Sequence, residues 1–307
     1  MKIAVARYPV DAPGSFAAFA DKQRGWLYQA AADGASLAVL PEYLALELAA
    51  GLDAGTRADT VASFAALQRL RADWLALFAR LARETRMHVQ AGTFLHGVGG
   101  GRYRNRADLF APNGGYGWQD KLQLTGFEKK TGVIEGGDTL RVFEIAGVRA
   151  GIAVCYDSEF PLPVRAQVEA GAQLILVPSC TDTAAGATRV RVGCLARALE
   201  NRCFVAQAVT AGEAPWSPVL DINTGEAAVY APMDVGFPDD GVLAATHAPG
   251  WAYAEIDIAQ LEASRESAQV ANDRDWRGQL APGLAAARVQ ALVAPGPGRR
   301  SSQVKSD

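Results

Sequence analysis

The sequence predicts an α/β fold built around a mixed sheet. Short apolar runs rich in β-branched residues alternate with longer stretches of helical spacing, which is the pattern of βα units. Two turn-rich segments also separate pairs of strand-like runs, and such hairpins add antiparallel strands. The 307 residues, of which 50% are apolar and 21% are charged, are typical of one or two soluble globular domains.

Six apolar runs bounded by Gly, Pro or Asn are predicted to be buried strands: Ile3–Ala6, Leu37–Leu40, His88–Phe94, Ala150–Cys155, Leu174–Val177 and Cys203–Val209. Helical spacing predicts helices over Phe16–Ala32, Ala58–Arg86, Leu162–Ala170 and Ala187–Arg202. One hairpin is expected around residues 112–115, between Arg106–Ala111 and Tyr116–Lys121. A second is expected around residues 221–225, between Pro218–Leu220 and Ala227–Tyr230.

The composition excludes several classes of protein. The 30 basic and 33 acidic residues are interspersed, so no nucleic-acid partner is expected. Four cysteines without a C-x-x-C pair, and no H-E-x-x-H, predict no metal site and reduced thiols. No run is long enough for a signal peptide or a bilayer span, so we expect a cytoplasmic protein with no membrane partner.

Cys155 ends a predicted strand and is followed by the polar run Tyr156-Asp157-Ser158-Glu159. This switch is typical of a nucleophile held at a sharp strand-to-helix turn, where backbone N–H groups face a developing oxyanion. The start of the next helix is also expected to lower the pKa of the thiol. By position alone, a free cysteine that only packs in the core is the more common explanation.

Glu42 and Lys121 are the candidate partners of this thiol. Glu42 follows the strand Leu37–Leu40 directly, where partial desolvation would raise its pKa toward that of a general base. Lys121 lies among aromatic and apolar neighbours in a chain that prefers arginine, and suits a point charge beside a reaction centre. A solvated loop glutamate and a surface lysine are the ordinary alternatives.

Other candidates are weaker. Glu128 precedes two lysines, which a surface turn explains without any function. None of His88, His96 and His247 ends a strand at a polar turn, although a Cys–His pair stays open because such partners meet only in space.

The combination of these blocks resembles the nitrilase (carbon–nitrogen hydrolase) superfamily. The blocks are Pro41-Glu42-Tyr43, Lys121-Leu122 with Glu128, and Gly151-Ile152-Ala153-Val154-Cys155-Tyr156-Asp157, continuing through Phe160-Pro161, Arg165, Gly171-Ala172 and Pro178-Ser179. The resemblance runs from the first strand to about Arg265. It implies a four-layer α-β-β-α sandwich with mixed sheets, a domain of residues 1–290, and a Glu-Lys-Cys triad with no cofactor. Residues 291–307, rich in Pro, Gly and Ser, are predicted to form a flexible tail.

The resemblance also implies roles for these residues. Glu42 would be the general base, Lys121 would stabilise the tetrahedral intermediate, and Cys155 would be the nucleophile. Glu128 would orient the lysine and the substrate, and the N–H of Tyr156 would share the oxyanion. Tyr43 is expected to flank Glu42, and Cys180 and Thr181 to line the site, since they follow the strand next to that of Cys155. The family usually forms dimers or larger assemblies, so a homodimer is expected.

The residues after the nucleophile narrow the expected activity. Cys155-Tyr156-Asp157 resembles the amidase, carbamoylase and ω-amidase side of the superfamily rather than the Cys-Trp-Glu of enzymes that act on nitriles. Other stretches, such as Phe127-Glu128-Lys129-Lys130, resemble a branch with some members fused to a GNAT-type acetyltransferase domain, which we do not expect within this chain. Leu162 stands where Phe-Pro-Glu is common, so the contacts at the start of that helix are expected to differ.

The sequence thus predicts an amidohydrolase that cleaves a linear amide or carbamoyl bond of a small molecule through a thioester and releases ammonia or an amine. An N-acyltransferase, a nitrile-hydrolysing enzyme and a binding protein that keeps the fold remain alternatives. The substrate stays open.

Overall fold

The computed structural model describes residues 1–290, which fall into two compact units: Met1–Asp273 and the described residues after Asp273. The second unit contains two short 3-10 helices, η4 (Trp276–Leu280) and η5 (Pro282–Leu284), and α9 (Asn272–Asp275) lies at the boundary. The predicted tail, residues 291–307, lies outside the described residues, and the predicted domain limit at residue 290 stays a prediction. The sheet and the candidate site belong to the first unit.

One connected sheet organises this unit, and most of its strands follow one another in the order β5-β4-β3-β2-β1-β9-β8-β7-β6. The neighbours from β3 to β7 run parallel, whereas β4, β5 and β6 are added antiparallel at the two ends. The bounds are β1 (Lys2–Pro9), β2 (Leu37–Leu40), β3 (His88–Gly99), β4 (Arg102–Phe110), β5 (Tyr116–Asp120), β6 (Val142–Ile145), β7 (Val148–Ile152), β8 (Leu174–Ser179) and β9 (Phe204–Glu213).

Further strands pair with the middle of this order. β13 (Gly250–Glu255) lies antiparallel to β1, and β11 (Ala227–Tyr230) lies antiparallel to both β9 and β12 (Val242–Thr246). The short β10 (Ile222–Asn223) pairs with the end of β9. Parallel and antiparallel strands therefore share one sheet, which confirms the predicted mixed α/β fold.

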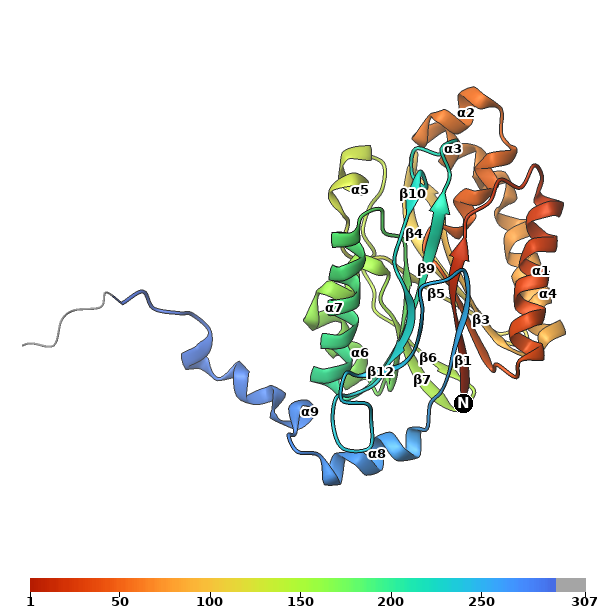
Figure 1. Ribbon diagram of the computed structural model, residues 1–307. Coiled ribbons are helices and arrows are strands. Elements are labelled where there is room, and N and C mark those ends of the chain that lie inside the picture. The colour runs from red at the N-terminus through yellow and green to blue at the C-terminus, as the bar shows by residue number, and fades with distance from the viewer. Residues whose placement is uncertain (291–307) are drawn as a thin grey trace, which may run out of the picture. The chain divides into compact units, whose positions relative to one another are not determined.

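Helices cover the strands from two sides. Figure 1 shows α1 and α4 along one side and α6 and α7 along the other, with the strands between them. Their bounds are α1 (Phe16–Ala32), α4 (Arg71–Thr85), α6 (Pro161–Glu169) and α7 (Ala184–Asn201). The predicted α-β-β-α layers are confirmed, with the addition that hydrogen bonds join the strands of both layers into one sheet. The shorter helices are η1 (Leu44–Gly51), α2 (Ala54–Ala58), α3 (Thr60–Leu67), η2 (Gln68–Leu70), α5 (Gly126–Thr131), η3 (Cys155–Glu159) and α8 (Ile258–Ser267).

Side chains of β1 alternate between two hydrophobic cores. Ile3 and Val5 belong to a core that includes side chains of β7, β8, β9 and α7, whereas Ala4, Ala6 and Tyr8 belong to a second core with α1 and α4. Each fully buried aliphatic side chain contributes about 1.5–3 kcal/mol. Because a slip of one residue would exchange the two faces, this alternation fixes the register of the strand.

Several predicted elements are confirmed, and α1 and β2 match their predicted ranges residue for residue. The hairpin around residues 112–115 joins β4 to β5. No helix within residues 1–290 combines the length and the apolar character needed to cross a bilayer.

Three predictions of detail were wrong. The helix expected over Ala58–Arg86 is divided into α3, η2 and α4, because the Gln68 side chain bonds the backbone of β3 at Leu95 and Gly97. The strand expected to reach Cys155 ends at Ile152, and the chain turns into η3. Residues Pro218–Leu220 form no strand, because the Ser217 hydroxyl accepts the N–H groups of Val219 and Leu220 and holds a turn.

Candidate active site

The candidate residues meet at one edge of the sheet. Glu42 follows β2, Lys121 follows β5, Cys155 follows β7 and Cys180 follows β8. All four strands run in the same direction, since β5 is antiparallel to β4 and β4 is antiparallel to β3. The carboxyl ends of such strands are where α/β sheets place their sites.

Lys121 is the centre of a buried ionic cluster. Its Nζ lies 2.8 Å from Glu42 Oε1 and 2.9 Å from Glu128 Oε2. The three side chains are at most 1% exposed. Glu128 is therefore buried and does not lie on a surface turn. The surface-turn explanation of a glutamate that precedes two lysines was wrong. Its carboxylate also caps α5, accepting the N–H of Thr125 at 2.8 Å.

Asn105 and Tyr43 complete the cluster. The Nδ2 of Asn105, on β4, donates to Glu42 Oε1 at 2.8 Å and more weakly to Glu128 Oε1 at 3.3 Å. The Tyr43 hydroxyl donates to Glu128 Oε1 at 2.7 Å, and its backbone N–H donates to Thr93 Oγ1. Both carboxylates thus have fixed rotamers before any substrate binds, which is the preorganisation that catalysis needs.

Cys155 begins η3 with a φ of +48°, in the left-handed region that residues with a side chain rarely adopt. Its Sγ donates to the carbonyl oxygen of Cys180 at 3.6 Å, and its own carbonyl accepts the Ser158 hydroxyl at 2.7 Å. The sharp turn predicted for a nucleophile is present.

The protonation states follow from burial and charge. Burial raises the pKa of Glu42, Lys121 opposes the rise and Glu128 adds to it. Burial alone would lower the pKa of Lys121, but the carboxylates of Glu42 and Glu128 hold it well above its ordinary value. Burial, followed by the charge of Glu42, raises the pKa of Cys155 well above its usual range. The site therefore holds a charged lysine and a protonated thiol.

The expected lowering of the thiol pKa was thus wrong. The helix that Cys155 begins is a 3-10 turn of five residues, too short to offer a substantial dipole. The charge of Glu42 acts in the opposite direction and raises the pKa of the thiol. Cys155 and Glu42 line the same cavity, and the charge of Glu42 acts on the thiol, so this carboxylate is the candidate acceptor of the thiol proton.

A cavity of about 350 Å³ opens onto this cluster. It is lined by the candidates Glu42, Tyr43, Lys121, Cys155, Tyr156, Cys180 and Thr181, whereas Glu128 contacts Lys121 but does not line the cavity. Residues not singled out from the sequence also line it: Thr125, Phe127, Glu159, Asp182, Arg189, Asp221 and Ile222 among them. The hydroxyl of Thr181 donates to the carbonyl of Thr224 at 2.5 Å. None of His88, His96 and His247 lines the cavity.

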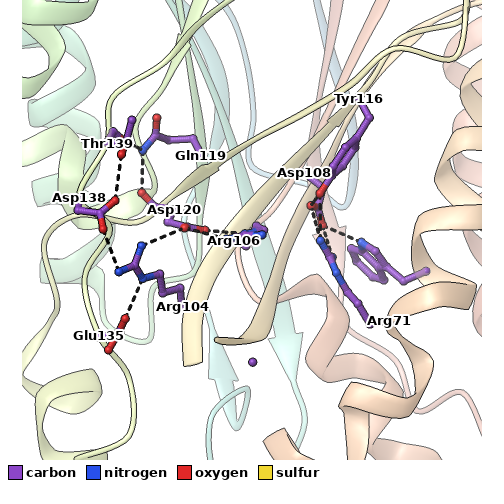
Figure 2. A network of polar contacts seen from close by, with 12 residues as sticks. Arg71, Arg104, Arg106, Asp108, Tyr116, Gln119, Asp120, Glu135, Asp138 and Thr139 are labelled. Atoms are coloured by element: carbon purple, nitrogen blue, oxygen red, sulfur yellow. Dashed lines mark hydrogen bonds and ion pairs between the residues drawn. The ribbon is translucent and has the colours of Figure 1, made fainter. Parts of the chain in front are cut away.

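Ion pairs hold the strands that carry Asn105 and Lys121 (Figure 2). Arg106 and Asp120, opposite each other in β4 and β5, form a two-pronged pair at 2.7 and 3.0 Å. Arg104 binds Glu135 at 2.9 Å and Asp138 at 3.1 Å. Between these pairs, the N–H of Lys121 donates to the carbonyl of Asn105 at 2.9 Å, so the two strands place both side chains together.

Comparison with known proteins decides the family. The family model described as carbon-nitrogen hydrolase matches residues 2–265. The chain belongs to the carbon–nitrogen hydrolase family. Among residues 1–290, no group of three or more His, Cys, Asp or Glu side chains could hold a metal ion.

Relatives of this carbon–nitrogen hydrolase support the assignment. The probable hydrolase YhcX of Bacillus subtilis is 30% identical over 283 residues, which is 90% of this chain but 54% of that protein, so this chain spans about half of the relative's length. Nit3 of Saccharomyces cerevisiae, a member of branch 10 of the nitrilase superfamily, has a TM-score of 0.69 at 17% identity, covering 89% of this chain and 96% of that one. An amidase from Nesterenkonia has a TM-score of 0.64 at 23% identity, covering 90% and 97%. The resemblance to a branch with GNAT fusions stays a prediction.

Proposed function

We propose that this carbon–nitrogen hydrolase is a cysteine-dependent amidase that cleaves a linear amide or carbamoyl bond of a small molecule through a thioester. The observation that carries the proposal is a lysine held between two buried carboxylates, with the lysine, one of the carboxylates and a buried thiol lining one cavity. The cavity volume of about 350 Å³ suits a small substrate rather than a folded protein chain.

In the first step, Glu42 takes the proton of Cys155 as the sulfur attacks the amide carbon. The resting thiol and the neighbouring carboxylate suit this concerted transfer, because a free thiolate would face the charge of Glu42. The carbonyl oxygen becomes an oxyanion, which the Lys121 ammonium and the N–H of Tyr156 stabilise.

The carbon–nitrogen bond then breaks. Glu42, now protonated, gives its proton to the leaving nitrogen, which departs as ammonia or an amine and leaves a thioester on Cys155. Water attacks the thioester while Glu42 takes a proton from it. When the second tetrahedral intermediate collapses, that proton returns to the sulfur, and the acid is released.

An acyltransferase would use the same thioester on Cys155 and pass the acyl group to an amine. A nitrile-hydrolysing enzyme would form that thioester from a nitrile instead of an amide. Hydroxylamine added during turnover separates hydrolysis from transfer. We expect the acid to remain the main product, with hydroxamate formed only in proportion to the hydroxylamine concentration. A preference for the amine well beyond that proportion would favour an acyltransferase.

The direct test is ammonia release from a panel of small amides by the Cys155→Ala variant. We expect activity to fall by at least about 10³-fold, because the nucleophile is gone, with little change in thermal stability. Cys194→Ala is the matched control, since Cys194 is also buried but lies on α7 away from the cavity. Substantial activity in Cys155→Ala would sink the proposal.

We also propose a homodimer. Three large apolar side chains of α6 and α7 are exposed on one half of the molecule: Leu162, Val192 and Leu199 are 67%, 56% and 37% exposed. Burying such side chains against a second copy would stabilise an assembly. Light scattering would then give twice the chain mass of 32.4 kDa.

A further inference from the structure

Asp157 is a buried carboxylate that the proposed reaction does not use. It is 1% exposed, lies two residues after Cys155 in η3, and does not line the cavity. A carboxylate removed from water must be compensated by donors, so its partners indicate what it does.

Its partners are backbone N–H groups from two distant segments. The N–H of Leu122 lies 3.1 Å from both carboxylate oxygens, and that of Gln123 lies 2.7 Å from Oδ1. The N–H of Val154 lies 3.2 Å from Oδ2. Leu122 directly follows Lys121, and Val154 directly precedes Cys155. One side chain therefore joins the backbone beside the lysine to the backbone beside the thiol.

These hydrogen bonds of Asp157 join two segments whose strands, β5 and β7, do not pair with each other in the sheet. Lys121 follows β5, at one end of the strand order, whereas Cys155 follows β7, near the other end. The turn at Cys155 is also strained, with its φ of +48°. Without a restraint from outside the turn, the sulfur and the ammonium could relax away from each other.

We propose that Asp157 is a positioning residue that fixes the Cys155 sulfur relative to the Lys121 ammonium. The inference rests on the proposed function, since it assumes that these two groups act together. Every partner of the carboxylate is a donor, so the ionised acid is the form that fits. An amide in its place would turn an N–H group toward backbone N–H groups and force them apart.

The test compares Asp157→Asn with a matched control, Asp108→Asn. Asp108 is equally buried and bonded to Arg71, Trp74 and Tyr116. These contacts, also drawn in Figure 2, share no residue with the ion pairs of Arg104 and Arg106, and Asp108 does not line the cavity. Both variants lose a satisfied buried carboxylate. We expect only Asp157→Asn to lose about 100-fold in kcat with KM within about threefold, since a small misplacement of reacting groups has that effect.

A second readout needs no known substrate. Iodoacetamide, itself a small amide, alkylates Cys155, and peptide mass spectrometry gives the rate. We expect the alkylation rate to fall by at least about tenfold in Asp157→Asn and to stay at the wild-type value in Asp108→Asn. The reason is that the reactivity of a thiol depends on the position of the charged groups beside it. Asp157→Ser, which removes the charge without adding a donor amide, is expected to behave in the same way.

The outcomes are decisive. If Asp157→Asn and Asp108→Asn have equal kcat per folded molecule and equal alkylation rates, Asp157 is only structural. If neither Asp157 variant folds at low temperature, the positioning role is also contradicted. If the wild-type protein releases no ammonia from any amide, the proposed function fails, whereas the alkylation rates still report on Asp157.

Discussion

Glu42, Glu128 and Lys121 place two carboxylates and one ammonium in contact, with each side chain at most 1% exposed. Burial, followed by the charge of Glu42, keeps the Cys155 sulfur protonated, and the two carboxylates keep the lysine charged. In the proposed mechanism the proton therefore moves during the attack itself, and Glu42 must be ionised to accept it. At the residue scale, we therefore expect an acidic limb of activity to which the ionisation of Glu42 contributes.

That dependence has a definite sign. Glu42 accepts the proton only when ionised, so kcat/KM should fall as the pH drops through its pKa, which burial raises above the ordinary 4.5. Glu128→Gln removes a charge that raises this pKa, so the acidic limb should move to lower pH. We also expect kcat to fall about tenfold, because Lys121 loses a charge-assisted hydrogen bond.

Glu47→Gln is the control for this profile. Glu47 is a buried glutamate paired with Lys22 at 2.5 Å, and it does not line the cavity. The acidic limb of kcat/KM in Glu47→Gln should match that of the wild type. A limb in Glu128→Gln that stays in place, or moves to higher pH, would show that Glu42 is not the titrating base.

At the element scale, the contact between α7 and η3 holds the nucleophile turn. Arg197 on α7 donates to the carbonyl of Ser158 at 3.2 Å, and the Ser158 hydroxyl in turn bonds the carbonyl of Cys155. Gly193 faces the same point: a Cβ there would lie 2.9 Å from the carbonyl oxygen of Ser158. The close approach of the helix depends on this glycine.

Gly193→Ala should therefore destabilise the protein by about 1–3 kcal/mol through overpacking and lower kcat by displacing Ser158. Gly25→Ala is the matched control, because Gly25 lies inside α1 with open space around it. That change should stabilise the protein by up to about 1 kcal/mol through helix propensity alone. Urea unfolding and measurement of kcat check both variants. Wild-type stability and full activity in Gly193→Ala would show that the close approach of α7 to η3 does not depend on this glycine.

Sequence patterns predicted the elements where a local cause is strong. α1 has Ser15 as its N-cap and buries Phe19, Gln23, Leu27 and Ala30 along one face, so its range could be predicted. The division of Ala58–Arg86 could not, because it depends on Gln68 reaching β3. The absence of the predicted strand Pro218–Leu220 could not be foreseen either, because it depends on the side chains of Ser217 and Asn223, which hydrogen-bond to the backbone of a turn.

At the scale of the whole molecule, the candidate site assembles from strands at both ends of the sheet order. Glu42, Lys121 and Cys155 could be predicted as candidates because each follows an apolar or aromatic run and because their blocks together resemble the family. Asn105 could not be selected, since a polar residue inside β4 has no distinctive local pattern. Asp157 was part of the block Cys155-Tyr156-Asp157, but its bonds to a distant backbone could not be predicted. Their importance arises only when distant segments meet.

The central claim is that Cys155 carries the acyl group. The most direct measurement is the intact mass of the protein, quenched in acid during turnover of a panel of small amides and carbamoyl compounds, followed by peptide mapping. The account predicts an acyl adduct on Cys155 that hydroxylamine removes and that Cys155→Ala never shows. Turnover without an adduct on Cys155, together with an active Cys155→Ala variant, would contradict it.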